Sequence, residues 1–325
     1  MTETISVEQF REYAARVESE VGKVIVGQNE IVRHVLVGIL SGGHVLLEGV
    51  PGLGKTMLIR TLGQALDLKF SRIQFTPDLM PSDILGTEIL SDENGQREFR
   101  FRQGPLFANL VLADEINRAT PKTQSALLEA MQESSVTVAQ KTHRLEEPFF
   151  VLATQNPLEM EGTYPLPEAQ LDRFLFKVNV NLPEVADMVE ILERTTGKET
   201  PAAGRAISGA DLLQMRTLAR AVPLASHVKE YIAKLVLATH PEHPTATPLV
   251  KKYVRYGSSP RGGQALVLGS KVTALLAGRY NVAFEDVESV APAAFRHRLL
   301  LNFDGLAEGI STDAVIAELL KELPH

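Results

Sequence analysis

The sequence predicts an α/β domain built on a parallel sheet, followed by a helical domain. Five short apolar runs alternate with helical patterns, which is typical of a sheet that helices cover on both faces. Beyond residue 183 the strand signals fade and helical patterns take over. We therefore expect a core in residues 1–183 and a helical domain in residues 184–325. The five runs are residues 45–47, 70–75, 110–113, 149–153 and 174–180.

Two helices are expected before the first strand. Ser6 and Gln9 have the spacing of a capping box, and apolar residues then recur at helical spacing as far as Val21. A second helical pattern begins near Ile31 and stops at the glycine pair 42–43.

Two segments between the later strands are expected to form β-hairpins that stand off the sheet. The segment between Leu85 and Leu106 contains Asn94-Gly95, the favoured pair of a type I′ turn, and aromatic residues alternate with arginines after it. Residues 134–148 are the second segment that is expected to form a hairpin. The helices expected in the second domain are residues 185–194, 210–221, 227–240, 261–279, 285–301 and 313–323.

Composition restricts the class of protein. The chain has 325 residues, of which 44% are hydrophobic, so it can bury a substantial core. It has no cysteine, its first residues do not resemble a signal peptide, and no stretch approaches the ~18 apolar residues that a membrane span needs. A soluble, cytoplasmic protein is expected. The net charge of -7 argues against a broad surface for nucleic acid.

The segment GVPGLGKT, residues 49–56, has the pattern of a phosphate-binding P-loop. It follows the first strand and opens a helical pattern, as that motif requires. Its glycines allow backbone N–H groups to turn toward a phosphate at the helix N-terminus. Lys55 would reach the β- and γ-phosphates, and Thr56 would coordinate Mg²⁺. The alternative is a glycine-rich turn that binds nothing.

Two later strands end in polar residues that fit the same chemistry. Asp114 follows an apolar strand and would hold Mg²⁺, and Glu115 is the candidate base for the attacking water. Asn156 follows the next strand, where its amide could position that water or sense the γ-phosphate. The alternatives are two solvated acids at a strand end, and an asparagine that begins a turn before Pro157.

Two arginines complete the candidate set. Arg261 lies in the first turn of a helix that Ser259 would cap, where a cation opposes the helix dipole, so a phosphate contact is one interpretation and a tolerated surface arginine the other. Arg173 stands at the head of the run 174–180. An ion pair with Asp172 or Glu168 would explain it, although surface pairs of that kind contribute little.

In order, the motifs VGQ, GVPGLGKT, LADEINRA, ATQNP, EAQLDRF and SSPRGGQAL resemble those of the MoxR-type AAA+ ATPases, in the helix-2-insert clade. The resemblance covers nearly the whole chain and implies a P-loop NTPase core with a five-stranded parallel sheet and a C-terminal, all-helical lid. It implies ATP and Mg²⁺ as cofactors, and assembly into a homo-oligomeric, usually hexameric, ring. The implied partners are proteins with von Willebrand factor A domains and client proteins whose assembly or maturation the ring assists.

The resemblance also assigns roles to residues. Asp114 and Glu115 become Walker B, Asn156 sensor 1, Arg261 sensor 2, and Arg173 the arginine finger that points at a neighbouring subunit's nucleotide. The resemblance leaves open whether Arg261 contacts the nucleotide of its own subunit or that of a neighbour. Arg118 would make a further contact between subunits. The nucleotide-binding residues implied are Val26 and Gly27 at the adenine end, and Gly49, Pro51, Gly52, Leu53, Gly54, Lys55, Thr56 and Met57 around the phosphates, with Thr56 and Asp114 at the metal.

The sequence leaves three more functions open. A DNA-stimulated translocase or helicase subunit is suggested by Lys141, His143 and Arg144 on the second hairpin and by arginines 97, 100 and 102 on the first. The acidic balance opposes it. A nucleotide-gated scaffold, in which ATP binding alone matters, and a chelatase-type motor subunit also fit the motifs.

Overall fold

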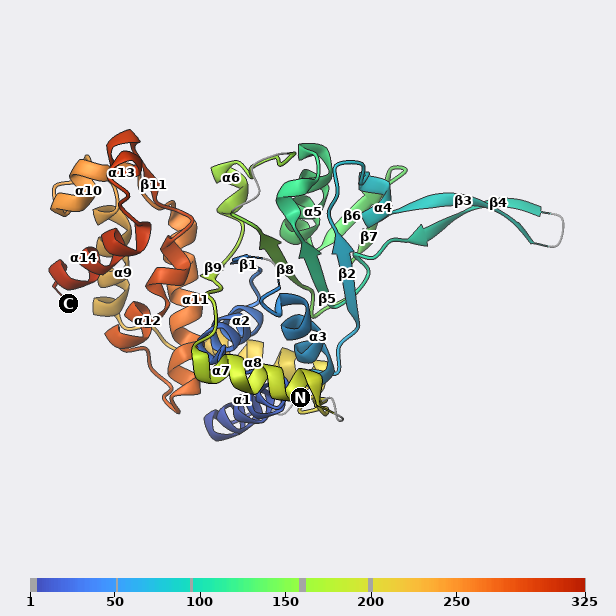
Figure 1. Ribbon diagram of the computed structural model, residues 1–325, viewed down its shortest axis with the longest axis horizontal. Coiled ribbons are helices and arrows are strands. Elements are labelled where there is room, and N and C mark those ends of the chain that lie inside the picture. The colour runs from blue at the N-terminus through green and yellow to red at the C-terminus, as the bar shows by residue number, and fades with distance from the viewer. Residues whose placement is uncertain (1–4, 51, 94–95, 158–161, 198–200, 325) are drawn as a thin grey trace.

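The computed structural model describes residues 5–50, 52–93, 96–157, 162–197 and 201–324. An α/β core lies in the middle of the molecule, with the C-terminal helices at one side and a long β-hairpin projecting from the other (Figure 1). Within the described residues no helix is both long and apolar enough to cross a membrane.

The core sheet has five parallel strands in the order β2-β5-β8-β1-β9. Each strand comes from one of the five apolar runs, so the prediction of a parallel sheet is confirmed. The strands are β1 (Val45–Glu48), β2 (Phe70–Gln74), β5 (Leu110–Asp114), β8 (Phe150–Gln155) and β9 (Phe176–Asn179).

Alternate residues of the strands enter two separate cores. On β1, Val45 and Leu47 join a cluster with helices α1, α2 and α3, whereas Leu46 joins a cluster with α4 and α5. This alternation follows from the two-residue period of a strand and explains why the runs are apolar throughout. The core helices are α1 (Val7–Gly22), α2 (Asn29–Ser41), α3 (Lys55–Ala65), α4 (Pro81–Leu85), the 3₁₀ turn η1 (Ile116–Arg118), α5 (Pro121–Glu133) and α6 (Glu168–Leu171).

The predicted helix signals at the N-terminus are confirmed. The Ser6 hydroxyl accepts a hydrogen bond from the Gln9 N–H, and the Gln9 side chain accepts one from the Ser6 N–H. Helix α2 ends at Gly42, whose φ of 72° is the left-handed conformation that glycine adopts without strain.

The last core strand begins later than the sequence suggested. The N–H groups of Arg173 and Phe174 donate to Gln170 and Leu171, so the turn of α6 continues through these residues. Phe174 is apolar because it is buried, not because it belongs to a strand. Arg173 therefore lies in the turn between α6 and β9, and the strand starts at Phe176.

Both predicted hairpins are present. The first consists of β3 (Gly86–Glu93) and β4 (Gln96–Gln103), and the second of β6 (Ser135–Val138) and β7 (Lys141–Arg144). The turn pair Asn94-Gly95 lies outside the described residues. The β3–β4 hairpin extends well beyond the core (Figure 1), and the two hairpins touch where the ring of Phe101 stacks on His143 with centroids 4.0 Å apart.

In the part of the C-terminal domain that the structure describes, the chain is helical, as predicted, except for one short antiparallel pair of strands, β10 with β11. The helix expected over 285–301 ends at Phe295, and Leu300–Leu301 forms β11 instead. Apolar periodicity continues through the buried Leu299, so it could not reveal this end. The elements are α7 (Val185–Thr196), α8 (Gly209–Ala221), α9 (Ser226–Ala238), α10 (Pro248–Tyr253), β10 (Val254–Tyr256), α11 (Pro260–Leu276), α12 (Phe284–Phe295), β11 (Leu300–Leu301), α13 (Phe303–Ala307) and α14 (Thr312–Glu322).

Helix α8 contacts both α2 of the core and α11 of the C-terminal domain. The division of the chain at residue 183 stays a prediction.

Candidate functional site: a nucleotide site and a distant pair of arginines

The segment 49–56 forms a loop between β1 and α3, the context that a P-loop requires. Gly52 and Gly54 have φ of 86° and 76°, values that residues with a Cβ rarely adopt. They turn the backbone into the N-terminus of α3, where amide N–H groups favour an anion. Pro51, also assigned to this loop by resemblance, lies outside the described residues.

Lys55 is the first residue of α3, and its side chain folds over the loop. Its Nζ donates to the carbonyl oxygens of Gly49 at 2.5 Å and Val50 at 3.3 Å. Burial lowers the pKa of Lys55, while the negative charges of Asp114 and Glu115 act in the opposite direction. The lysine therefore lies close enough to the acidic strand end to share one site with it.

Thr154 joins the two acidic residues at the end of β5. Its hydroxyl donates to Asp114 Oδ1 at 2.7 Å and accepts the Glu115 N–H at 2.8 Å. Glu115 itself has φ 57° and ψ 51°, a left-handed conformation that is uncommon for a residue with a side chain and tends to occur at functional sites. Thr154 thus holds both carboxylate residues in fixed positions.

Two residues of β2 that the sequence analysis missed also hold these acids. Arg72 forms an ion pair with Asp114 at 2.7 Å, and Gln74 donates to Glu115 at 2.7 Å. Both are polar residues in the run 70–75, and they are two positions apart, so they share one face of the strand. This pattern could have identified them from the sequence. Arg118, expected at a subunit contact, donates to Glu115 of its own chain at 2.9 Å.

The strand order brings the predicted site residues to one edge of the sheet. β5, β8 and β1 are neighbours, and Asp114, Asn156 and Gly49 stand at or just after their carboxyl ends. The Gly49 N–H donates to the Gln155 carbonyl at 3.2 Å, which fixes the P-loop beside β8. Asn156 is buried, at 4% exposure. The described residues contain no group of three or more His, Asp or Glu able to hold a metal, so a cation at Thr56 and Asp114 would take its other ligands from phosphate and water.

A largely apolar cavity of about 280 Å³ lies beside the P-loop. Gln28 Nε2 donates to the Leu53 carbonyl at 2.9 Å and ties the segment before α2 to the loop. Gly27 has φ +70°, and a Cβ there would lie 2.2 Å from Asp187 Oδ2 on α7, so only glycine allows this approach. The contribution of α7 was missed from the sequence. The lining includes Val26, Gly52, Leu53, Gly54, Met57, Met188 and Ile191.

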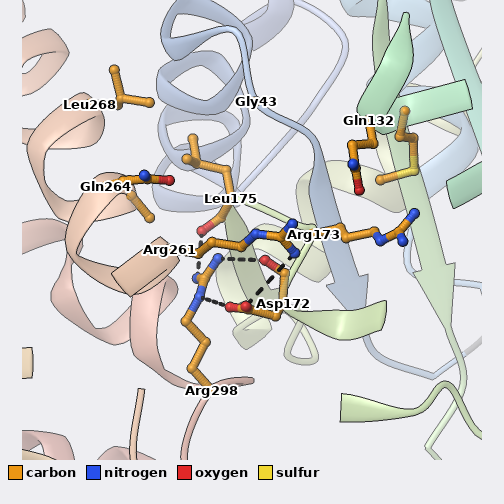
Figure 2. Close-up of a pocket in the computed structure, with 11 residues that line it drawn as sticks. Gly43, Gln132, Asp172, Arg173, Leu175, Arg261, Gln264, Leu268 and Arg298 are labelled. Carbon is orange, nitrogen blue, oxygen red and sulfur yellow. Dashed lines mark hydrogen bonds and ion pairs between the residues drawn. The ribbon is translucent and has the colours of Figure 1, made fainter. Parts of the chain in front are cut away.

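The two candidate arginines lie together elsewhere. Arg173 and Arg261 line a hollow of about 200 Å³, in which the Asp172 carboxylate lies between Arg261 and Arg298 (Figure 2). Arg173 Nη1 donates to the Leu128 carbonyl at 2.9 Å, and Arg261 Nη1 lies 3.9 Å from Asp172 Oδ2. The carboxylate of Asp172 therefore faces Arg261, and the ion pair between Arg173 and Asp172 considered from the sequence is not formed.

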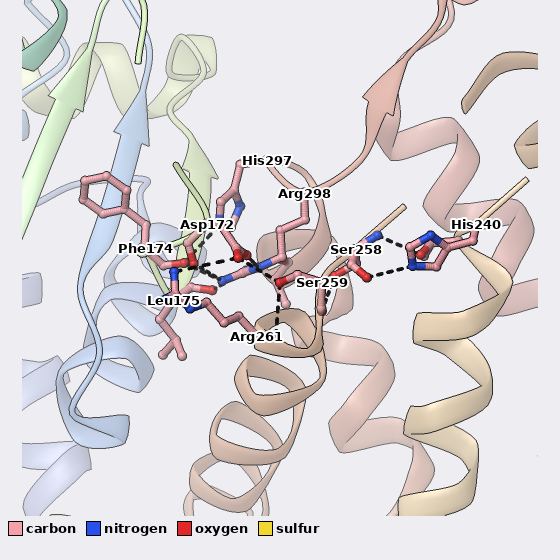
Figure 3. A network of polar contacts seen from close by, with 11 residues as sticks. Asp172, Phe174, Leu175, His240, Ser258, Ser259, Arg261, His297 and Arg298 are labelled. Atoms are coloured by element: carbon pink, nitrogen blue, oxygen red, sulfur yellow. Dashed lines mark hydrogen bonds and ion pairs between the residues drawn. The ribbon is translucent and has the colours of Figure 1, made fainter. Parts of the chain in front are cut away.

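Arg298, which the sequence analysis did not single out, fixes the turn that carries Arg173. Its buried guanidinium donates to Asp172 Oδ1 at 2.8 Å and to the Phe174 carbonyl at 2.7 Å, among other backbone carbonyls (Figure 3). Burial lowers the pKa of Arg298, and the Asp172 carboxylate opposes that effect. Ser259, the cap of α11, donates to Asp172 Oδ2 at 2.8 Å. One carboxylate thus joins the Arg173 turn to the Arg261 helix.

This arginine hollow lies at the opposite edge of the sheet from the P-loop. Gly43, in its lining, stands before the first residue of β1, and Gly49 follows the last. At about 3.3 Å per residue, the six steps between them span up to ~20 Å. Within one chain, Arg173 and Arg261 therefore lie far from the phosphate loop.

Comparison with known proteins shows which families the chain is similar to. Residues 44–176 match the family of ATPases associated with various cellular activities (AAA), and residues 247–319 match the AAA lid domain. Chaperone MoxR1 of Mycobacterium tuberculosis is 46% identical over 93% of this chain and 79% of its own. Protein MoxR of Methylorubrum extorquens is 31% identical over 90% of this chain and 89% of its own.

A solved structure from Cytophaga hutchinsonii, described as that of a candidate ATPase, has a TM-score of 0.91 and 42% identity. The alignment covers 98% of this chain and 96% of the chain in that structure. The fold, the matched families and the P-loop define an AAA+ ATPase, an enzyme that hydrolyses ATP. Within that class, the chain belongs to the MoxR family. The predictions of fold class, family and ATPase activity are confirmed.

Proposed function

We propose that the chain hydrolyses ATP with Mg²⁺ in a homo-oligomeric ring, in which arginines of the next subunit complete each catalytic site. The observation that carries this proposal is the placement of Arg173 and Arg261 at the edge of the sheet opposite Lys55. An arginine supplied by a second molecule can raise the rate of phosphoryl transfer by ~10³- to 10⁵-fold. Because Arg261 shares this placement, we propose that it too contacts the neighbour's nucleotide.

Within one subunit, the geometry of the P-loop edge supports the other roles that we propose. Lys55 would leave its contacts with the loop carbonyls and bind the β- and γ-phosphates, and the left-handed glycines would direct N–H groups at the same oxygens. Thr56 and Asp114 would hold Mg²⁺, which supplies positive charge to the phosphate oxygens.

Glu115 would accept a proton from the attacking water or orient it, since its carboxylate is held by Gln74 and Arg118 near the loop lysine. Asn156, next to the P-loop, would donate its amide to that water or to the γ-phosphate. The base would enter the cavity beside Val26 and Gly27, where Met57 and α7 offer apolar surface.

We further propose that hydrolysis drives chaperone-like remodelling of a partner protein in the cytoplasm. One relative carries the name chaperone, which supports this direction. By family resemblance the ring is hexameric and works with a protein that has a von Willebrand factor A domain. The hairpins present exposed apolar side chains for such contacts, including Leu90 at 54% and Phe99 at 70% exposure.

The nucleic-acid alternative receives less support from the structure. Lys141 forms an ion pair with Glu88 at 3.5 Å, and His143 stacks on Phe101, so both serve the contact between the hairpins. DNA that stimulates ATP turnover in a salt-dependent manner would favour that alternative over the remodelling function.

The test of the proposed function is ATP turnover by wild-type protein with Mg²⁺, set beside the Glu115→Gln variant. We expect the wild type to hydrolyse ATP with a specific activity that rises with protein concentration, and the variant to bind ATP without hydrolysis. Affinity capture on the ATP-bound variant should then retain the partner protein. A specific activity that does not depend on protein concentration would contradict the ring. Glu115→Gln that supports function in cells, while Lys55→Ala does not, would favour the scaffold instead.

A further inference from the structure

Helix α7 exposes an apolar ridge to solvent. None of its residues is buried. The apolar side chains of Val185 and Val189 are 83% and 51% exposed. Val189 and Leu192 follow Val185 at four and seven residues, which places these three side chains along one face of the helix, and Leu182, 72% exposed, lies just before it. We call Leu182, Val185, Val189 and Leu192 the α7 ridge.

The α7 ridge borders the nucleotide site. Met188 and Ile191, on the adjacent side of the same helix, line the cavity assigned to the base. Glu184 and Glu193 are exposed at the two ends of α7, and neither forms an ion pair within the described part of the chain. The surface is thus apolar with acidic flanks, and an exposed apolar face of this kind indicates an interaction site.

A groove in the C-terminal domain has the complementary character. It lies between α9 and α11, has a volume of about 810 Å³, and is mainly apolar in its lining. Leu237 within it is 47% exposed. The large aliphatic residues of this α9–α11 groove are Ile232, Val236, Leu237, Val267 and Leu268.

The rim of the α9–α11 groove is cationic. Arg220 and Lys229 line it, and Lys271 Nζ donates to the Arg220 carbonyl at 2.9 Å. Burial lowers the pKa of Lys271, and the positive charges of Lys229 and Arg220 lower it further. None of the three forms an ion pair with an acid among residues that the structure describes. The charge of the rim therefore opposes that of the acids on α7.

The groove is continuous with the arginine hollow. Gln264 and Leu268 line both, and Pro260, next to Arg261, lines the groove. If Arg261 reaches the nucleotide of a neighbouring subunit, the adjacent groove therefore also lies close to that subunit's base cavity. The α7 ridge lies beside that cavity.

We propose that the α7 ridge of one copy of this chain docks in the α9–α11 groove of the next copy. This inference rests on the proposed function for the direction in which Arg261 acts. Two different surfaces meet at such a contact, so it is head-to-tail, the kind of contact from which a ring is built when the rotation between copies closes. Each contact would place the groove over the base cavity and Arg261 over the phosphates of the same nucleotide.

The chain contains no cysteine, so two introduced cysteines test the contact directly. Protein with Val189→Cys is mixed with protein carrying Leu237→Cys, in the presence of ATP and Mg²⁺, and oxidised mildly. We expect a cross-linked dimer in the mixture and none in either variant alone. The control pairs Val189→Cys with Phe303→Cys, which is 83% exposed on α13 and outside the groove. Equal yield from the control pair, or cross-linking of Val189→Cys with itself, would overturn the proposal.

A second test uses apolarity and charge. Val185→Asp should raise the protein concentration at which half the chains assemble by about 10- to 100-fold, because burial of one valine contributes that much to binding. Phe303→Asp, matched in exposure, should leave assembly unchanged. Glu193→Lys and Lys229→Glu should each weaken assembly, and a mixture of the two should recover part of it through reversed pairs.

These outcomes separate the inference from the proposed function. If the wild type hydrolyses ATP cooperatively but Val185→Asp assembles like Phe303→Asp, only the docking surface is wrong. If the wild type neither assembles nor hydrolyses ATP, the proposed function fails as well.

Discussion

Replacing Thr154 by valine removes one hydroxyl that contacts both acids of the candidate site. The side chain is 1% exposed, and valine has nearly the same shape, so the substitution leaves no cavity. It deletes the bond to Asp114 Oδ1 at 2.7 Å and leaves the Glu115 N–H without the acceptor that lay 2.8 Å away. The effect is therefore confined to hydrogen bonding.

The expected magnitude follows from these two contacts. A hydrogen bond to a charged group contributes about 1.5–3 kcal/mol, and an unsatisfied buried N–H costs about 1–3 kcal/mol. We expect the free energy of unfolding to fall by roughly 3 kcal/mol. If about 2 kcal/mol of that loss also affects the orientation of Asp114 and Glu115 in the transition state, kcat falls about 30-fold.

Urea unfolding followed by circular dichroism measures the first effect, and a coupled ATPase assay measures the second. The control is Thr154→Ser, which keeps the hydroxyl and should retain most of both properties. Equal stability and equal kcat in the valine and serine variants would refute the role of Thr154 as the link between the acids.

Three further predictions concern other parts of the molecule. Gly27→Ala should raise KM for ATP, because a Cβ 2.2 Å from Asp187 Oδ2 displaces α7 from the base cavity. The control Gly22→Ala has open space around the added Cβ and should leave KM unchanged. Equal KM values for the two variants in steady-state assays would contradict this prediction. Burial lowers the pKa of His44 to about 4. As the pH is lowered from ~6.5 to 4, only the unfolded chain takes up this proton, so the free energy of unfolding should decrease by up to ~1.4 kcal/mol for each pH unit. His44→Gln should reduce that slope in urea titrations, and an unchanged slope would exclude His44 as its source. Arg298→Met should cost about 3–5 kcal/mol in thermal unfolding because it removes the donor to Asp172 Oδ1 and to buried backbone carbonyls, and a variant as stable as the wild type would refute this.

Local sequence patterns predicted much of the fold and the P-loop edge of the site. The glycines and Lys55 follow each other directly, and Asp114, Glu115 and Asn156 follow the ends of strands, so strand order alone brings them together. The hydrogen bonds that orient these residues could not be predicted in the same way. Thr154 also lies near the end of its strand, but its double contact depends on the register between β5 and β8.

The arginine hollow depends on contacts that local patterns do not encode. Arg298 contacts Asp172 across 126 residues of the chain. The run 174–180 has the composition of one strand because burial in a turn and burial in a sheet select the same apolar residues. The position of Arg173 relative to the P-loop could be found only from the assembled sheet.

Hydrolysis shared between neighbouring subunits can be tested by mixing two inactive variants. Lys55→Ala copies lack the phosphate-binding lysine but present Arg173, whereas Arg173→Ala copies bind ATP but lack the finger. In mixed rings of equal proportions, about a quarter of the interfaces join an intact lysine to an intact arginine. We predict that each variant alone is inactive and that the mixture regains ATP hydrolysis in proportion to these interfaces. ATPase activity in the mixture that equals only the sum of the separate variants, or full activity of Arg173→Ala alone, would contradict an arginine supplied across the subunit boundary.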